Sequence, residues 1–202
     1  MNIAIFGGSF DPPHAGHDEI VKAALNTLDI DKLIIIPTFC SPFKSEFSAL
    51  PKQRLSWCKA LWGENLENSE NSENSENSEN SKILVSDFEI LRGLKNGQKT
   101  PTITSVRHFK ELLKPQKIYL IIGADCLENL HKWAEFSNLC KLVEFVVATR
   151  ENSQIPDCFK TLKNLEINVN ISSSIIRKNL DFKQVLPKIL DEVKEFYGRK
   201  NQ

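Results

Sequence analysis

Two histidines, His14 and His17, follow a pair of glycines near the start of the chain and stand three positions apart. At this spacing on a helix the two imidazoles are neighbours, so both can donate N–H hydrogen bonds to one polyphosphate. Donors of this kind stabilise the charge that builds at phosphorus during in-line displacement, and neither needs to be a nucleophile. A zinc site is disfavoured, because no thiolate or third histidine lies at ligand spacing. The pair therefore predicts chemistry at a phosphate.

The residues on either side supply the elements that such a site needs. An apolar run at residues 3–6 predicts a strand, and Gly7-Gly8 lets the backbone turn with its N–H groups outward. Residues 15–28 carry apolar side chains on one helical face, which predicts a helix whose N-terminus lies over the loop and attracts an anion. In isolation His14 would be a turn residue and His17 a packing residue. The glycine loop, strand and helix together favour the phosphate site.

Strand and helix patterns alternate along the rest of the chain. Most of the predicted strands are apolar on both faces, which is typical of a parallel sheet covered by helices. The sequence therefore predicts an α/β fold with a doubly wound, mostly parallel sheet. After the first strand and helix, the expected strands are residues 33–36, 83–90, 118–122, 142–148 and 165–171, and the expected helices are residues 51–62, 103–113, 127–133, 173–180 and 187–197.

The polar clusters of the chain come directly after these strands. Ligands of open parallel sheets bind beyond the carboxyl ends of the strands, so we expect the clusters to meet in one place. They are residues 7–17, 37–44, 123–125, 149–150 and 172–177.

Two of these clusters resemble known motifs. Residues 7–17, Gly-Gly-Ser-Phe-Asp-Pro-Pro-His-Ala-Gly-His, resemble the signature of the nucleotidylyltransferase superfamily, whose core is His-x-Gly-His, and are most similar to its bacterial nicotinate-nucleotide adenylyltransferases. Residues 171–177, Ile-Ser-Ser-Ser-Ile-Ile-Arg, resemble the serine-rich signature near the C-terminus of the same superfamily. Two motifs in the right order are more specific than either alone. The resemblance covers nearly the whole chain and implies a single Rossmann-like domain over residues 1–202.

The resemblance also implies a reaction and a set of site residues. AMP would pass from ATP to nicotinate mononucleotide, giving nicotinate adenine dinucleotide and pyrophosphate in NAD biosynthesis, with Mg²⁺ carried on the ATP and no metal held by the protein. Catalytic roles fall on His14, His17 and Arg177. Contacts to ATP are assigned to Gly7, Gly8, Ser9, Phe10, Gly123, Asp125, Ile171, Ser172, Ser173 and Ser174, and contacts to the acceptor to Lys44, Thr102, Trp133 and Arg150.

Several of these residues also have ordinary structural explanations. Lys44 would serve equally as a solvated loop residue, Asp125 as a helix N-cap, and Trp133 as a core residue at helical spacing. Arg54 resembles a helix-borne arginine of the family and is equally well explained as a surface residue whose stem packs on the protein. The sequence leaves these alternatives open.

One segment departs from the family pattern. Where the family has Ser-Tyr-Thr-x-Asp-Thr for recognition of the nicotinate carboxylate, this chain has Thr-Pro-Thr-Ile-Thr-Ser at residues 100–105. Pro101 lacks an N–H, so a carboxylate would be held by the amides of Thr102 or Ile103 or by the Thr102 hydroxyl. The preference between a nicotinate and a nicotinamide acceptor therefore stays open.

Two other functions fit part of the pattern. Pantetheine-phosphate adenylyltransferases have a similar histidine motif and serine signature, but they usually carry a single glycine and a threonine at the position of the first histidine, unlike Gly7-Gly8 and His14 here. A nucleotide-sensing module that binds ATP without turnover would be favoured by loss of a histidine or of the arginine. His14, His17 and Arg177 are all present.

Composition agrees with an enzyme of one domain. The 202 residues, 41% of them hydrophobic, are enough to bury a core. No apolar run approaches the length of a membrane span and no signal peptide is recognisable, so we expect no membrane association and a cytoplasmic location. A homo-oligomer is left open. The cysteines form no Cys-x-x-Cys pair and are expected to be free thiols: Cys40, Cys58, Cys126, Cys140 and Cys158.

Residues 67–81 repeat Glu-Asn-Ser five times. They carry five of the 26 acidic residues and no basic one, so the neutral total conceals a mildly basic remainder. That remainder suits anionic nucleotides, but its excess is too small to indicate nucleic-acid binding. Without an apolar residue the repeat cannot bury a face, and we expect a disordered surface loop at about residues 64–81.

Overall fold

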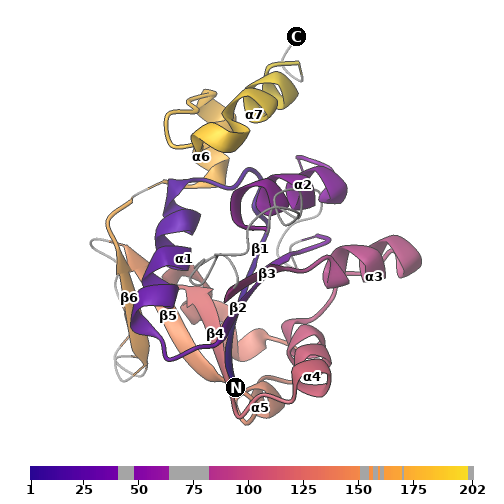
Figure 1. The fold of residues 1–202 in the computed structure, drawn as a ribbon, viewed down its shortest axis with the longest axis vertical. Coiled ribbons are helices and arrows are strands. Elements are labelled where there is room, and N and C mark those ends of the chain that lie inside the picture. Colours follow the sequence, from indigo (N-terminus) through magenta and orange to yellow (C-terminus); the bar gives the residue numbers. More distant parts are fainter. Residues whose placement is uncertain are drawn as a thin grey trace, which may run out of the picture.

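A six-stranded sheet, parallel throughout, forms the centre of the molecule (Figure 1). The computed structural model describes residues 1–40, 48–63, 82–150, 155–156, 159, 162–169 and 171–199. The strand order is β3-β2-β1-β4-β5-β6. The strands are β1 (Asn2–Gly8), β2 (Lys32–Pro37), β3 (Ile83–Val85), β4 (Lys117–Gly123), β5 (Glu144–Arg150) and β6 (Lys163–Ile167).

Helices lie between most of the successive strands and cover both faces of the sheet, which confirms the predicted α/β doubly wound class. They are α1 (Ala15–Thr27), α2 (Pro51–Trp62), α3 (Phe88–Asn96), α4 (Thr102–Leu113), the 3₁₀ helix η3 (Ala124–Lys132), α5 (Phe136–Leu139), α6 (Ser173–Asn179) and α7 (Pro187–Arg199). None of the helices among the described residues is long and apolar enough to cross a membrane.

Alternate side chains of each central strand enter two separate cores. Ala4 and Phe6 of β1 face the core under α1 and α2, whereas Ile3 and Ile5 face the core under α4, η3 and α5. This alternation follows from the two-residue period of a strand, and it explains why the central strands read as continuous apolar runs. A third apolar cluster joins α2, α6 and α7, which lie together at one end of the molecule in Figure 1.

The prediction of one strand over residues 83–90 is wrong. The strand β3 ends at Val85, and the helix α3 begins at Phe88. The N–H of Phe88 donates a hydrogen bond to the Ser86 hydroxyl oxygen at 3.2 Å. The alternation of Val85 with later apolar residues mimicked a strand, but a serine side chain that bonds the backbone two residues on turns the chain instead. The last strand is also shorter than expected and ends at Ile167 rather than at Ile171.

The order of the strands locates the ligand edge of the sheet. Successive connections run to one side from β1 through β2 to β3, and to the other side from β4 through β5 to β6, so the chain changes direction between β1 and β4. In open parallel sheets the crevice for a nucleotide lies at this switch point, beyond the carboxyl ends of the strands. The strand β1 ends at Gly8 and β4 ends at Gly123, two glycines that the sequence assigned to ATP.

Candidate active site

The two histidines lie against each other beyond the end of β1. His14 immediately precedes α1 and His17 lies in its first turn, and the centres of their rings are 3.8 Å apart. The backbone N–H of His14 donates to Nδ1 of His17 at 3.2 Å. A neutral imidazole that accepts at Nδ1 carries its proton at Nε2. His17 is therefore held as a donor through Nε2, the form needed to bind a phosphate oxygen.

The surroundings keep both imidazoles neutral. Burial, together with the nearby charge of Arg150, lowers the pKa of His14 to about 4. Burial, His14 and Arg150 lower the pKa of His17 well below its usual range. His14 is only 2% exposed, and its Nδ1 has no hydrogen-bond partner among the described residues. A buried polar atom left unpaired costs about 1–3 kcal/mol, a cost that a hydrogen bond to a ligand would remove.

The start of α1 offers fewer free N–H groups than the sequence implied. The N–H of Ala15 donates to the Gln184 carbonyl at 2.8 Å, and the N–H of His17 donates to the His14 carbonyl at 2.8 Å. These bonds use donors that a helix N-terminus would otherwise present to an anion. The free polar groups at this end of the sheet are therefore mainly side chains and not the amides of the helix N-terminus.

The ring of Phe10 packs against the ring of His17. Its side chain is fully buried, and its ring centre lies 4.9 Å from that of His17 in an edge-to-face arrangement. Its φ of 48° places the backbone in the left-handed region, which turns the chain sharply after β1. A β-carbon on Gly8 would stand 2.9 Å from the Phe10 ring, so this turn requires glycine. Gly7 has more room, with only the Ile36 carbonyl at 4.0 Å from such an atom.

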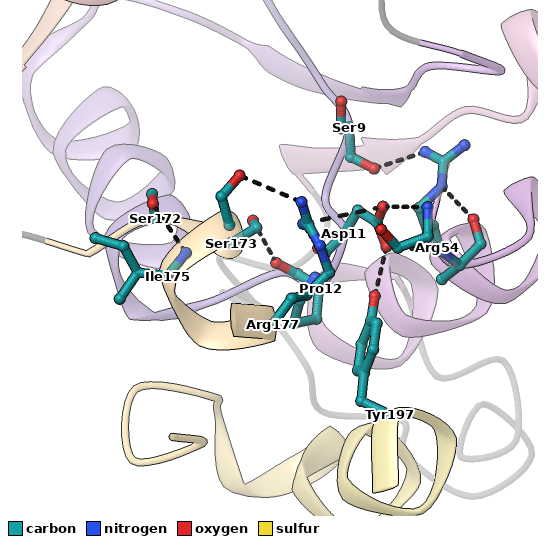
Figure 2. A network of polar contacts seen from close by, with 12 residues as sticks. Ser9, Asp11, Pro12, Arg54, Ser172, Ser173, Ile175, Arg177 and Tyr197 are labelled. Atoms are coloured by element: carbon teal, nitrogen blue, oxygen red, sulfur yellow. Dashed lines mark hydrogen bonds and ion pairs between the residues drawn. The ribbon is translucent and has the colours of Figure 1, made fainter. Parts of the chain in front are cut away.

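The C-terminal signature meets the histidine loop, as Figure 2 shows. Arg177 donates through Nη1 to the Asp11 carbonyl and through Nη2 to the Ser174 hydroxyl at 3.2 Å. The Ser173 hydroxyl donates to the Pro12 carbonyl at 2.9 Å. These contacts confirm that the two signature segments lie side by side, although they are far apart in sequence.

The two other signature residues have structural contacts. Ser172 caps α6, its hydroxyl oxygen accepting the Ile175 N–H at 3.3 Å. Ile171 packs against the third apolar cluster, between α2, α6 and α7. Neither observation tests the assignment of these residues to ATP.

Asp125 lies beside the end of β4. Gly123, and not Asp125, is the N-cap of η3, so the alternative of Asp125 as the cap is wrong. Asp125 is exposed in the first turn, and a β-carbon on Gly123 would stand 2.3 Å from its Oδ1. Glycine at this position therefore gives the carboxylate room to fold back over the strand end.

The segment that departs from the family pattern begins α4. Pro101 is its N-cap, and the Thr104 N–H already donates to the Pro101 carbonyl at 2.9 Å. The amides of Thr102 and Ile103 belong to the first turn, whose N–H groups have no partner within the helix. Thr100, which the sequence did not single out, has a buried Oγ1 with no hydrogen-bond partner among the described residues.

Three further assignments have different outcomes. Trp133 packs at the edge of the core under α4 and η3, and its buried Nε1 has no hydrogen-bond partner in the described part of the chain. Arg150 ends β5 with an exposed side chain whose charge reaches both histidines. Lys44 lies outside the described residues.

The surface position considered for Arg54 is wrong. Its side chain is 1% exposed, and its guanidinium donates to the carbonyls of Ser9 at 2.6 Å, Phe39 at 2.8 Å and Ala49 at 3.1 Å. Arg54 thus holds the loops after β1 and β2 together. The Ser9 carbonyl is used in this bond, which leaves only its N–H and hydroxyl for a ligand.

Comparison with known proteins agrees with this geometry. A family model described as cytidylyltransferase-like matches residues 5–179. A Campylobacter fetus protein named "Probable nicotinate-nucleotide adenylyltransferase" is 52% identical over 201 residues, which are 100% of this chain and 99% of that protein. A Nitratiruptor protein of the same name is 39% identical over 197 residues, with 98% and 99% covered. The chain therefore belongs to the cytidylyltransferase-like family, and within it to the nicotinate-nucleotide adenylyltransferases.

Solved structures share the fold. A Plasmodium falciparum nicotinic acid mononucleotide adenylyltransferase complexed with NaAD superposes with a TM-score of 0.71 at 24% identity, covering 99% of this chain and 96% of that one. A structure from Vibrio parahaemolyticus, described as a nicotinate-nucleotide adenylyltransferase by inference, gives a TM-score of 0.61 at 16% identity, with 95% and 97% covered. At these identities the likeness supports the fold alone.

Proposed function

We propose that this chain transfers the adenylyl group of ATP to the phosphate of nicotinate mononucleotide. An acceptor phosphate oxygen attacks the α-phosphorus of ATP, the bond from that phosphorus to the β-bridging oxygen breaks, and pyrophosphate leaves with the electron pair. The products are nicotinate adenine dinucleotide and pyrophosphate. The observation that carries the proposal is the neutral His17, oriented by the His14 N–H at the ligand edge of the sheet.

His17 acts in this reaction as a hydrogen-bond donor and not as a base. Phosphate oxygens of the acceptor are already ionised at pH 7, so no group has to remove a proton. With Nδ1 occupied, Nε2–H is the group that faces the α-phosphate, where charge builds in the transition state. No covalent intermediate forms.

The neutral His14 and the neighbouring cationic side chains bind the outer phosphates. His14 lies against His17, and Arg150 adds a positive charge close to both rings. Arg177, Ser173 and Ser174, which belong to the C-terminal signature bonded to this loop, hold the leaving pyrophosphate. Mg²⁺ enters as part of the substrate Mg·ATP and offsets the charge of the triphosphate.

The two ends of the dinucleotide lie at different strands. Asp125 accepts the ribose hydroxyls of one nucleotide beside the strand end at Gly123, as carboxylates at this edge of such sheets do. The amides of Thr102 and Ile103 hold the nicotinate carboxylate at the start of α4, and Trp133 lies against the pyridine ring. Lys44 completes the acceptor site in this proposal.

The cytoplasm is the compartment that fits the proposal. It supplies ATP, and its reducing conditions suit the free thiols of Cys58, Cys126 and Cys140.

One assay tests the function and the acceptor. Pyrophosphate release from Mg·ATP is measured with nicotinate mononucleotide, nicotinamide mononucleotide or phosphopantetheine as acceptor. We expect the highest kcat/KM for nicotinate mononucleotide, because the α4 amides favour a carboxylate over an amide. Equal turnover of the nicotinamide form would contradict the acid selectivity, turnover of phosphopantetheine alone would overturn the acceptor, and no turnover with any acceptor would indicate a nucleotide-binding module.

A further inference from the structure

A buried carboxylate lies within the loop that carries the histidines. Asp11 is 2% exposed, three positions before His14. Its Oδ2 accepts the N–H of Ser48 at 3.0 Å, its Oδ1 accepts the N–H of Ala49 at 3.0 Å, and Oδ1 also accepts the hydroxyl of Tyr197 (Figure 2). At this burial Asp11 is unavailable to a substrate, so any effect it has on the reaction passes through the position of its loop.

Three backbone carbonyls of this loop accept hydrogen bonds from side chains of other elements. Arg54 of α2 binds the Ser9 carbonyl, Arg177 of α6 binds the Asp11 carbonyl, and Ser173 binds the Pro12 carbonyl. The side chain of Asp11 adds α7 to this set through Tyr197. Three helices thus fix the backbone immediately before His14.

Of the residues that bind this loop, Tyr197 is the most distant in sequence from Asp11, at 186 positions. It is 3% exposed and packs in the third apolar cluster, with its ring centre 6.0 Å from that of Trp57 and 5.0 Å from that of Phe196. Burial and the neighbouring Asp11 raise the pKa of its hydroxyl, so Tyr197 stays protonated and donates. A phenylalanine would serve the packing equally well but would not bind the carboxylate.

We propose that Tyr197 is a positioning residue for adenylyl transfer, acting from α7 through the Asp11 carboxylate on the loop that holds His14 and His17. This inference rests on the proposed function. The hydrogen bond from the His14 backbone to His17 Nδ1 transmits the effect, because a shift of the loop moves the N–H that sets the orientation of the His17 ring. Small displacements of a positioned catalytic group reduce the rate far more than they reduce substrate binding.

The test compares two matched substitutions of the only two tyrosines in the chain. Tyr197→Phe removes the hydroxyl that binds Asp11. Tyr119→Phe changes a residue of similar burial, at 2% exposure, whose hydroxyl accepts from Lys163 at 3.2 Å within the sheet. We expect Tyr197→Phe to lower kcat roughly tenfold with KM for ATP changed less than about twofold, and Tyr119→Phe to leave kcat near that of the unchanged protein.

Two further measurements separate positioning from general destabilisation. Imidazole ¹H–¹⁵N spectra of the free protein are expected to show a shift of the His17 signals in Tyr197→Phe and none in Tyr119→Phe. In the background of Asp11→Asn, Tyr197→Phe is expected to lower kcat by less than about twofold, since residues that act as one unit are non-additive. If Asp11→Asn does not fold, the spectra and the two tyrosine variants still decide.

The proposal is overturned if Tyr197→Phe retains both the kcat and the His17 signals of the unchanged protein, or if its loss of kcat multiplies in full with that of Asp11→Asn. If either result is obtained while the unchanged protein still makes the dinucleotide, the positioning role of Tyr197 is wrong but the proposed function is unaffected. Absence of dinucleotide from the unchanged protein would contradict the function, whatever the spectra show.

Discussion

At the scale of single residues, the account depends most on the proton of His17. Replacing His17 by alanine removes the donor at the α-phosphate, where charge builds only in the transition state. We therefore expect His17→Ala to lower kcat by about 10²–10³, or about 2.7–4 kcal/mol, the cost of losing one such donor. ATP binding should change much less. Steady-state kinetics and equilibrium titration with ATP measure the two effects.

The amide variant is the matched control for this prediction. His17→Asn retains a neutral N–H donor and should recover part of the lost rate, whereas an amide cannot replace a general base or a metal ligand. Equal losses of rate and of ATP binding, or an alanine variant with near-normal turnover, would contradict the donor role and indicate that His17 is structural.

Asp125 should behave in the opposite way. Ribose hydroxyls bind equally in the ground state and in the transition state, so Asp125→Ala should weaken nucleotide binding with little change in kcat. Loss of hydrogen bonds to a charged group predicts a rise in the dissociation constant of roughly tenfold or more. Glu128→Ala is the control, because Glu128 is an exposed carboxylate on the same 3₁₀ helix. A fall in kcat alone would contradict the ribose assignment.

At the scale of helices and strands, a buried carboxyl joins α3 to α4. Glu89 is 5% exposed and accepts the Ser105 hydroxyl at 2.6 Å. Ser105 follows Thr102, whose amide is proposed to bind the acceptor, by three positions on α4. Burial raises the pKa of Glu89 from 4.5 to about 7, an effect that the Ser105 hydrogen bond partly opposes. The folded state therefore keeps a proton that the unfolded chain loses between these two values.

This difference predicts a pH-dependent stability. As pH rises from about 4.5 to 7, the unfolded chain ionises first, and the free energy of unfolding falls; above pH 7 the full cost remains. Glu89→Gln stays neutral, so its free energy of unfolding should exceed that of the unchanged protein by up to about 3 kcal/mol at pH 8 and by almost nothing at pH 4. Urea unfolding at both pH values measures this.

An exposed glutamate on α4 provides the comparison for Glu89. Glu111→Gln should give the same unfolding free energy as the unchanged protein at pH 8. A Glu89→Gln variant that is destabilised equally at both pH values would show that the carboxyl is needed for packing and carries no ionisation cost.

The elements show how far sequence reasoning reaches. The central strands and α1 were predictable because long apolar runs and helical spacing are local signals. The helix α3 was missed because a single side-chain bond from Ser86 decides where β3 ends. The sequence left Arg54 open between a family role and a surface position, and its burial could not be foreseen because fully buried arginines are rare.

The site shows the same division. His14, His17 and Arg177 stand in recognisable motifs; the structure places the two histidines against each other and bonds Arg177 to the loop that carries them. The bond from Tyr197 to Asp11 joins the two ends of the chain, and no periodicity or spacing reports such a pair. The presence of Asp11 within the first motif was the only sequence signal for this network.

At the scale of the whole molecule, the repeat at residues 67–81 lies outside the described residues, between α2 and β3. Its composition gives it no apolar side chain to add to either core. Deleting these residues should change the free energy of unfolding by less than about 1 kcal/mol and leave kcat/KM unaltered, since loop closure depends weakly on length. A glycine-serine segment of equal length is the control, and a larger loss that the control shares would show that the repeat contacts the body.

The measurement that tests the central claim most directly is rapid-quench analysis of the unchanged protein with Mg·ATP labelled at the α-phosphate. With nicotinate mononucleotide present, the account predicts labelled nicotinate adenine dinucleotide and pyrophosphate in equal amounts from the first turnover. Without the acceptor it predicts no pyrophosphate and no label on the protein. A burst of pyrophosphate equal to the enzyme in the absence of acceptor, or ATP binding that never yields a dinucleotide, would contradict direct adenylyl transfer at the His14–His17 site.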